Sequence, residues 1–143
     1  MAKKKVICII PARGGSKGIK LKNLRKVCNK PLIYYPIKAA LKSKACDKIL
    51  VSTDSKLIAK YAIKYGAKVL YPRPSKLSDA YSTIMDVIKF EIKNLENKQF
   101  KFNNVCCIFP ATPFLKAKYL SDGLKLLKKS SSKGFIFTGN EIP

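Results

Sequence analysis

Short hydrophobic runs alternate along the chain with segments in which hydrophobic residues recur every three to four positions. Residues 6–10 (Val-Ile-Cys-Ile-Ile) are apolar at every position, the pattern of a β-strand buried on both faces of a parallel sheet. Similar runs predict further strands at 48–53, 68–71, 104–109 and 135–137. The spacing between these runs predicts helices at 33–44, 57–65, 84–95 and 119–127.

The alternation of strands and helices predicts the fold class. It favours an α/β architecture, an open, mostly parallel Rossmann-like sheet with helices on both faces. A length of 143 residues fits one domain, residues 1–143. The sequence stops at Pro143, shortly after the last expected strand and without a closing helix, so we expect this domain to be incomplete at its C-terminal end.

Composition and charge narrow the possible chemistry. Histidine is absent, which excludes Ser-His-Asp triads and histidine-ligated metals. The formal net charge of +22 comes almost entirely from lysines dispersed along the helices, and it would attract polyanions without giving specificity. No apolar stretch approaches the ~20 residues of a membrane span. The first apolar run is too short for a signal peptide, so we expect a cytoplasmic protein.

The five cysteines carry no recognisable motif. Their number is odd and no Cys-x-x-Cys pair occurs, which fits neither a disulfide framework nor a zinc site. Cys8, Cys106 and Cys107 lie within apolar runs, so we interpret them as small core residues.

The loop after the first strand, residues 11–23, is the strongest candidate site. Ligands of open α/β sheets bind beyond the carboxyl ends of the strands. This loop contains three glycines, which allow backbone N–H groups to converge on an anion, and the cations Arg13, Lys17, Lys20 and Lys22. Its spacing matches neither a P-loop nor a dinucleotide fingerprint. The pattern indicates phosphate binding, with a simple surface turn as the alternative.

Read in full, residues 12–23 (Ala-Arg-Gly-Gly-Ser-Lys-Gly-Ile-Lys-Leu-Lys-Asn) resemble the amino-terminal signature of the acylneuraminate cytidylyltransferase family. Further matches follow in order at 30–33, 51–54, 65–68, 73–74, 77–79 and 109–114. The resemblance covers essentially the whole chain. It implies magnesium-dependent transfer of CMP from CTP to a nonulosonic acid, an acidic nine-carbon sugar, with release of pyrophosphate.

The resemblance also implies roles for individual residues. Those expected to hold the triphosphate and stabilise the leaving group are Arg13, Lys17 and Lys22. Those expected to bind the nucleotide are Ala12, Gly14, Gly15, Ser16, Asn23, Arg73 and Thr83. Some have simpler alternatives: Arg73 as a solvated loop residue, and Asp54 and Thr83 as helix caps.

Departures from the family pattern limit what the resemblance implies. The acidic residues form no paired motif, so we assign no metal ligand here and expect the Mg²⁺ ligands beyond Pro143. The turn at 109–113 (Phe-Pro-Ala-Thr-Pro) lacks the glutamine of many sialic-acid members, which leaves the sugar open. A full-length form is expected to be a homodimer. The alternatives are a nucleotide-binding pseudoenzyme and a basic nucleic-acid-binding module, although no specific nucleic-acid motif is visible.

Overall fold

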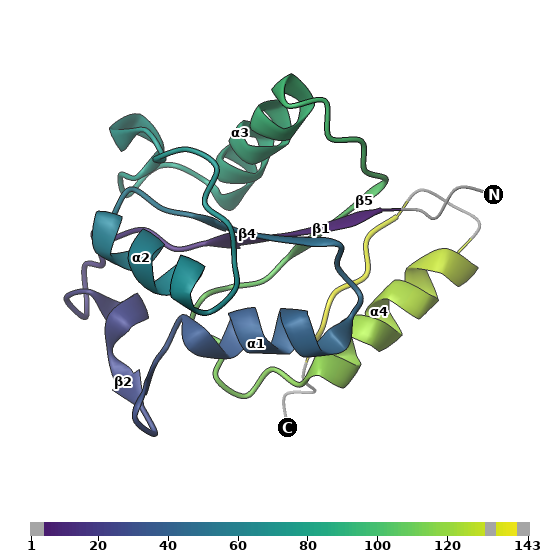
Figure 1. Cartoon of the computed structure of the whole chain (residues 1–143), viewed down its shortest axis with the longest axis horizontal. Helices are drawn as coiled ribbons and strands as arrows, with labels where there is room; N and C mark the ends of the chain where they lie inside the picture. Colours follow the sequence, from purple (N-terminus) through teal and green to yellow (C-terminus); the bar gives the residue numbers. More distant parts are fainter. Residues whose placement is uncertain (1–4, 131–133, 140–143) are drawn as a thin grey trace.

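The computed structural model describes residues 5–130 and 134–139. Three parallel strands form the central sheet in the order β4-β1-β5 (Figure 1). Their bounds are β1 Val6–Pro11, β4 Lys48–Ser52 and β5 Asn104–Cys107. Four helices accompany them: α1 Tyr34–Ser43, α2 Lys56–Lys64, α3 Ile84–Asn97 and α4 Ala117–Lys129.

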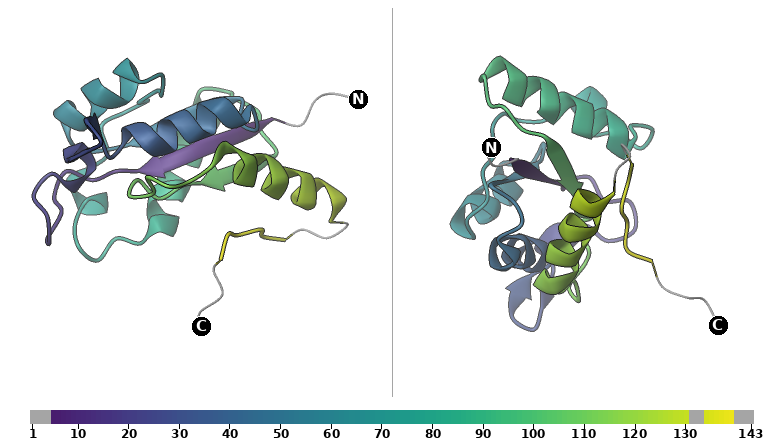
Figure 2. Two further views of the ribbon diagram at one scale, coloured as in Figure 1. Left: turned by 90° about the horizontal axis from the view of Figure 1, so that it is seen from below. Right: turned by 90° about the vertical axis from the view of Figure 1, so that its right-hand side faces the viewer.

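Helices cover both faces of the sheet. Helix α3 lies on one face, and α1, α2 and α4 lie on the other (Figure 2). The position of β1 between two helix layers explains why residues 6–10 are all apolar. Ile7 and Ile9 pack toward Leu95 of α3, whereas Cys8 and Ile10 pack toward α1 and α2. The predicted α/β fold is therefore confirmed.

Local sequence signals set the helix ends. Pro36 lies in the first turn of α1, where its missing N–H costs no helical hydrogen bond. Ser55 caps α2 by accepting a hydrogen bond from the Ile58 amide at 3.3 Å. Gly66 follows α2 with a φ of +103°, a conformation that favours glycine. The described residues also contain short elements: the 3₁₀ turns η1 (Lys22–Leu24) and η2 (Ser75–Leu77), and the hairpin strands β2 (Lys26–Val27) and β3 (Lys30–Pro31).

Three expectations from the apolar pattern were wrong. Residues 68–71 contribute only one isolated bridge, between Lys68 and Leu50. Residues 135–137 form no strand, and the side chains of Phe135 and Phe137 are 90% and 86% exposed. Cys107 is exposed and is not a core residue. Phe135, Phe137 and Cys107 are largely uncovered by neighbouring elements among the described residues, whereas Val69 and Leu70 pack against the core without pairing as a strand.

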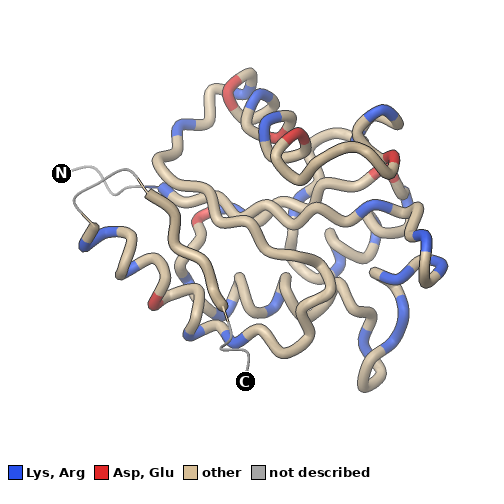
Figure 3. Tube along the Cα trace, turned by 180° about the vertical axis from the view of Figure 1, so that it is seen from behind, with Lys and Arg blue, Asp and Glu red and all other residues tan. Residues whose placement is uncertain are grey.

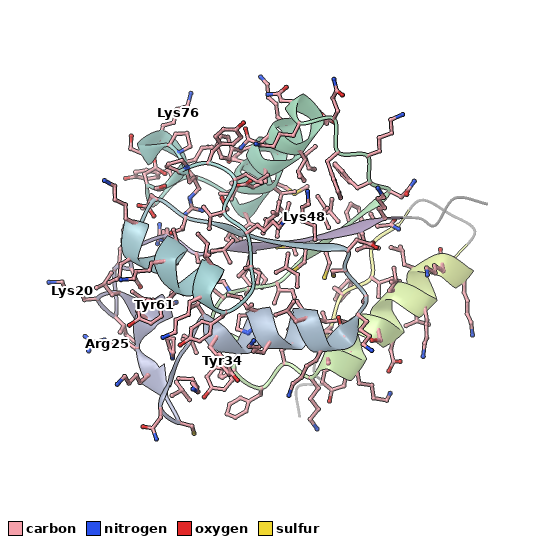
Figure 4. All side chains as sticks on the ribbon, in the orientation of Figure 1. Lys20, Arg25, Tyr34, Lys48, Tyr61 and Lys76 are labelled. Atoms are coloured by element: carbon pink, nitrogen blue, oxygen red, sulfur yellow. The ribbon has the colours of Figure 1, made fainter. Side chains whose placement is uncertain are left out.

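Lys and Arg positions are spread over the helices and loops, as the sequence indicates (Figure 3). Lys20 and Arg25, which flank η1, and Lys76 in η2 extend toward the outside of the molecule (Figure 4). Tyrosines fill the gap between α1 and α2, where the rings of Tyr34 and Tyr65 meet edge to face at 5.0 Å between centroids. Among the described residues, no helix combines the length and the apolar character needed to cross a bilayer.

Candidate functional site

A cleft of about 310 Å³ opens at the carboxyl ends of the parallel strands. Pro11 at the end of β1 and residues 109–110 after β5 form its floor, and residues 73–84 enclose it on the α3 side. Six predicted site residues line it: Arg13, Ser16, Lys22, Asn23, Arg73 and Thr83. Four others do not: Ala12, Gly14, Gly15 and Lys17. The structure thus brings together cations and polar groups from three separate loops.

Arg73 is the most buried charge of the cleft, at 5% exposure. Its Nε donates to the Ser78 hydroxyl at 3.2 Å, and its Nη2 lies 4.0 Å from the Asp54 carboxylate. No described residue accepts a hydrogen bond from Nη2. Burial lowers the pKa of Arg73, and the negative charge of Asp54 opposes that shift. The alternative of a solvated loop residue is therefore wrong, and a buried donor remains available at the cleft.

Asn23 offers a complementary acceptor. Its side chain is buried at 4% exposure, and its Nδ2 donates to the Arg13 carbonyl at 3.0 Å. Its Oδ1 accepts no hydrogen bond from any described residue. Because buried polar atoms are usually paired, an unpaired donor on Arg73 and an unpaired acceptor on Asn23 in one cleft indicate a polar ligand.

The loop between β1 and η1 is held by side chains from outside it. The Gly14 amide donates to Asp54 Oδ1 at 2.7 Å, and a Cβ added at Gly14 would lie 3.0 Å from Ser55 Cβ. No heavy atom lies within 4 Å of a Cβ added at Gly15 or Gly18. Of the three loop glycines, only Gly14 therefore lies where an added side chain would press against a neighbouring residue.

Further contacts join this loop to residues 79–83. The Arg13 Nη1 donates to the Asp79 carbonyl at 2.6 Å. Asp79 Oδ1 in turn accepts from the amides of Tyr81 and Ser82, at 3.0 and 2.7 Å, and from the Ser82 hydroxyl at 2.7 Å. These hydrogen bonds, with those of Ser82 strongest, lower the pKa of Asp79. The cleft wall is therefore tied to the first strand through Arg13.

The remaining predicted residues have varied placements. Ala12 is fully buried and its amide donates to the Ser52 carbonyl at 2.8 Å, so its side chain belongs to the core. Lys17 and Gly15 are exposed beside the cleft, and their roles stay predictions. Thr83 caps α3 in a capping box with Asp86 and also lines the cleft, which makes its two interpretations compatible.

Two acidic residues depart from the sequence interpretation. Ser55 and not Asp54 caps α2, whereas Asp54 orients the glycine loop and faces Arg73.

Glu91 of α3 was not anticipated from the sequence. Its side chain is 1% exposed, and neither carboxylate oxygen has a hydrogen-bond partner among the described residues. Burial raises its pKa, although the nearby Ser52, Asn94 and Arg73 oppose this. The available signal was its position four residues from each of Val87 and Leu95 on the buried face of α3.

Acidic side chains do not gather into a group of three or more among the described residues. Within that part of the chain, the only group of three or more potential ligands consists of cysteines, which are poor ligands for a hard cation. The Asp79 oxygen at the cleft already accepts three hydrogen bonds.

Together, the fold and the cleft define an α/β protein with a polar, cation-lined pocket at the point where this class binds nucleotides. The sequence matches the family described as cytidylyltransferase over residues 7–142. The chain therefore belongs to the cytidylyltransferase family, and the resemblance found in the sequence is confirmed.

Curated relatives lie in the nonulosonic-acid branch of this family. The chain is 38% identical over 138 residues to the pseudaminic acid cytidylyltransferase of Campylobacter jejuni, covering 96% of this chain and 59% of that protein. It is 38% identical over 128 residues to the CMP-N,N'-diacetyllegionaminic acid synthase of Legionella pneumophila, covering 87% and 53%. The chain therefore spans less than two thirds of the length of these relatives.

A solved structure shares the fold. The chain superposes on CMP:2-keto-3-deoxy-manno-octonic acid synthetase complexed with CTP with a TM-score of 0.72 at 20% identity, covering 88% of this chain and 48% of the other. At this identity the similarity supports the architecture alone.

Proposed function

We propose that the protein binds CTP and transfers CMP to the anomeric hydroxyl of a nonulosonic acid. The hydroxyl oxygen forms a bond to the α-phosphorus, the bond from this phosphorus to the bridging oxygen breaks, pyrophosphate leaves, and the hydroxyl proton passes to solvent. The observation that carries the proposal is the set of cations and unpaired polar atoms around the cleft in a member of this family.

Positioning and charge neutralisation are the contributions that this chain can make. Arg13 and Lys22 line the cleft next to the glycine loop, where they would hold the triphosphate and stabilise the leaving pyrophosphate. Lys17 is exposed at the same loop and would reach the phosphates from solvent. Phosphoryl transfer needs in-line placement more than covalent help, which suits a chain without histidine.

The base would be recognised at the inner end of the cleft. A cytosine ring offers an exocyclic amine that donates and a carbonyl that accepts. The unpaired acceptor of Asn23 and the unpaired donor of Arg73 are complementary to these two groups. ATP presents a different arrangement at its larger base, so the proposal includes discrimination between CTP and ATP.

Further parts of the proposal rest on the family resemblance. They are a requirement for Mg²⁺, a homodimer in the full-length form, and a cytoplasmic location. The five free cysteines of the described residues agree with a reducing compartment. The sugar is proposed only as a class, which includes pseudaminic, legionaminic and sialic acids.

Binding and turnover test the proposal separately. Calorimetry and thermal shift should show that CTP binds and stabilises the chain more than ATP does at equal concentration. Pyrophosphate release is then measured on the full-length form with CTP, Mg²⁺ and a panel of nonulosonic acids. Equal stabilisation by CTP and ATP would refute the nucleotide assignment, and CTP binding without turnover on the whole panel would favour the pseudoenzyme.

A further inference from the structure

Three cysteines from distant parts of the sequence meet in the layer between the sheet and α1. Cys8 lies in β1, its register partner Cys106 lies in β5, and Cys46 lies in the connection between α1 and β4. Their three Sγ atoms all lie within 4.8 Å of one another. Cys8 is fully buried and the other two are half-buried.

We propose that Cys8, Cys46 and Cys106, called the thiol cluster below, form a binding site for one thiophilic d¹⁰ metal ion of the Zn²⁺ and Cu⁺ class. Three sulfur ligands select soft ions over Mg²⁺. Zinc–sulfur bonds of about 2.3 Å place sulfurs about 3.8 Å apart in a tetrahedral site. Separations already within 4.8 Å therefore need only a small contraction to reach this geometry.

Metal ligands must lose their protons, and the three thiols differ in how readily they do so. Hydrogen bonds with Cys106 and Cys46, together with burial, raise the pKa of Cys8. Hydrogen bonds from the thiols of Cys46 and Cys8 lower the pKa of Cys106, so one thiolate is favoured inside the cluster. This interaction with Cys106 in turn raises the pKa of Cys46. A bound cation would relieve the repulsion among the thiolates and release the remaining protons.

An entry path leads to the cluster. A cavity of about 250 Å³ lies between β5, α4 and residues 134–138. Cys46, Cys106 and the neighbouring Cys107 are part of its lining, whereas Cys8 is not. Most of its wall is apolar, including Leu120 and Leu124 of α4. Of the cluster, an ion entering here would meet Cys46 and Cys106 before the buried Cys8. The cavity also leaves room for a fourth, exogenous ligand such as water.

This site is separate from the cleft at the carboxyl ends of the strands. None of the three cysteines lines that cleft. Metal binding is therefore measured without nucleotide, and its result does not depend on whether the proposed cytidylyl transfer occurs.

The test is a titration of the reduced chain with Zn²⁺ under anaerobic conditions, in competition with a colorimetric chelator. Cadmium titration, followed by thiolate-to-metal charge-transfer absorption, gives a second readout. We expect one ion per chain for the wild type. Cys46→Ser and Cys106→Ser should lose this binding, and circular dichroism confirms that each variant is folded.

The chain supplies matched controls. Cys28→Ser and Cys107→Ser remove exposed thiols outside the cluster and should keep one ion per chain. Zinc should also raise the melting temperature of the wild type and of both controls, but not of Cys46→Ser. Absence of competition by the wild type, or full binding by Cys46→Ser and Cys106→Ser, would overturn the proposal. Loss of binding in either control would overturn it as well.

Discussion

Replacing Gly14 by alanine tests how the candidate site is built. The new Cβ would lie 3.0 Å from Ser55 Cβ and 3.7 Å from Asp54 Oδ1, closer to the first than packed carbon atoms normally approach. Ser55 cannot give way easily because it caps α2. The loop must therefore shift, which also stretches the 2.7 Å hydrogen bond from the Gly14 amide to Asp54.

The magnitude follows from these two effects. Overpacking a close contact costs about 1–3 kcal/mol, and a hydrogen bond to a charged group contributes roughly 1.5–3 kcal/mol. Because one shift of the loop causes both losses, they do not add, and we expect Gly14→Ala to lower the free energy of unfolding by about 1–3 kcal/mol. CTP binding should weaken as well, since the loop carries Arg13 and Ser16 into the cleft.

Gly15→Ala is the matched control. Its Cβ meets no heavy atom within 4 Å and its φ is not in the left-handed region, so the change in unfolding free energy should stay within about 0.5 kcal/mol. Urea unfolding followed by circular dichroism measures stability, and calorimetry measures CTP affinity. Equal destabilisation by both variants, or none by Gly14→Ala, would refute the argument from the Ser55 contact.

Three further predictions concern the cleft and its support. Arg73→Lys should weaken CTP binding at least about tenfold in calorimetry, because a charge-assisted hydrogen bond contributes about 1.5–3 kcal/mol. The control Ser78→Ala removes only the partner of Arg73 Nε, so its affinity for CTP should stay much closer to that of the wild type. Thr83→Ala should lower the free energy of unfolding by about 1 kcal/mol through loss of the capping box with Asp86, whereas Thr83→Ser should preserve it in urea titrations. The folded-state pKa of Glu91 is raised, so the wild type binds more protons when folded and loses stability as pH rises from the ordinary range of glutamate through that pKa. Glu91→Gln should lack this loss and gain stability at neutral pH, by an amount within the roughly 1–3 kcal/mol typical of an unsatisfied buried group; a stability difference from wild type that does not change between acid and neutral pH would contradict this.

Elements with local signals could be predicted from the sequence, and those that depend on distant partners could not. The β1 strand is apolar at every position because it is the central strand, and α3 begins at a capping residue that precedes a helical pattern. Residues 68–71 and 135–137 have the same apolar composition as true strands. Whether such a run becomes a strand depends on a neighbour that pairs with it, which its own sequence does not encode.

The same distinction separates the two sites. The glycine loop is contiguous in sequence, so its candidate role could be inferred from one segment. The thiol cluster has no spacing motif, because its three sulfurs come from two strands and a loop that meet only in the folded sheet. Cys107 shows the converse: it adjoins Cys106 in sequence, but alternation along β5 leaves it outside the cluster.

The unpaired atoms of the cleft connect stability to ligand binding. In the unliganded chain, the Arg73 Nη2 donor and the Asn23 Oδ1 acceptor are buried without hydrogen-bond partners, and each such atom destabilises a fold by about 1–3 kcal/mol. A ligand that supplies a hydrogen-bond partner to both atoms removes this destabilisation when it binds, which adds to its binding free energy. A nucleotide that fits the cleft without reaching these atoms gains only the attraction of its phosphates to Arg13 and Lys22. Selectivity for the base is therefore expected to reside in Asn23 and Arg73, whereas the lysine-rich surroundings contribute affinity common to all nucleoside triphosphates.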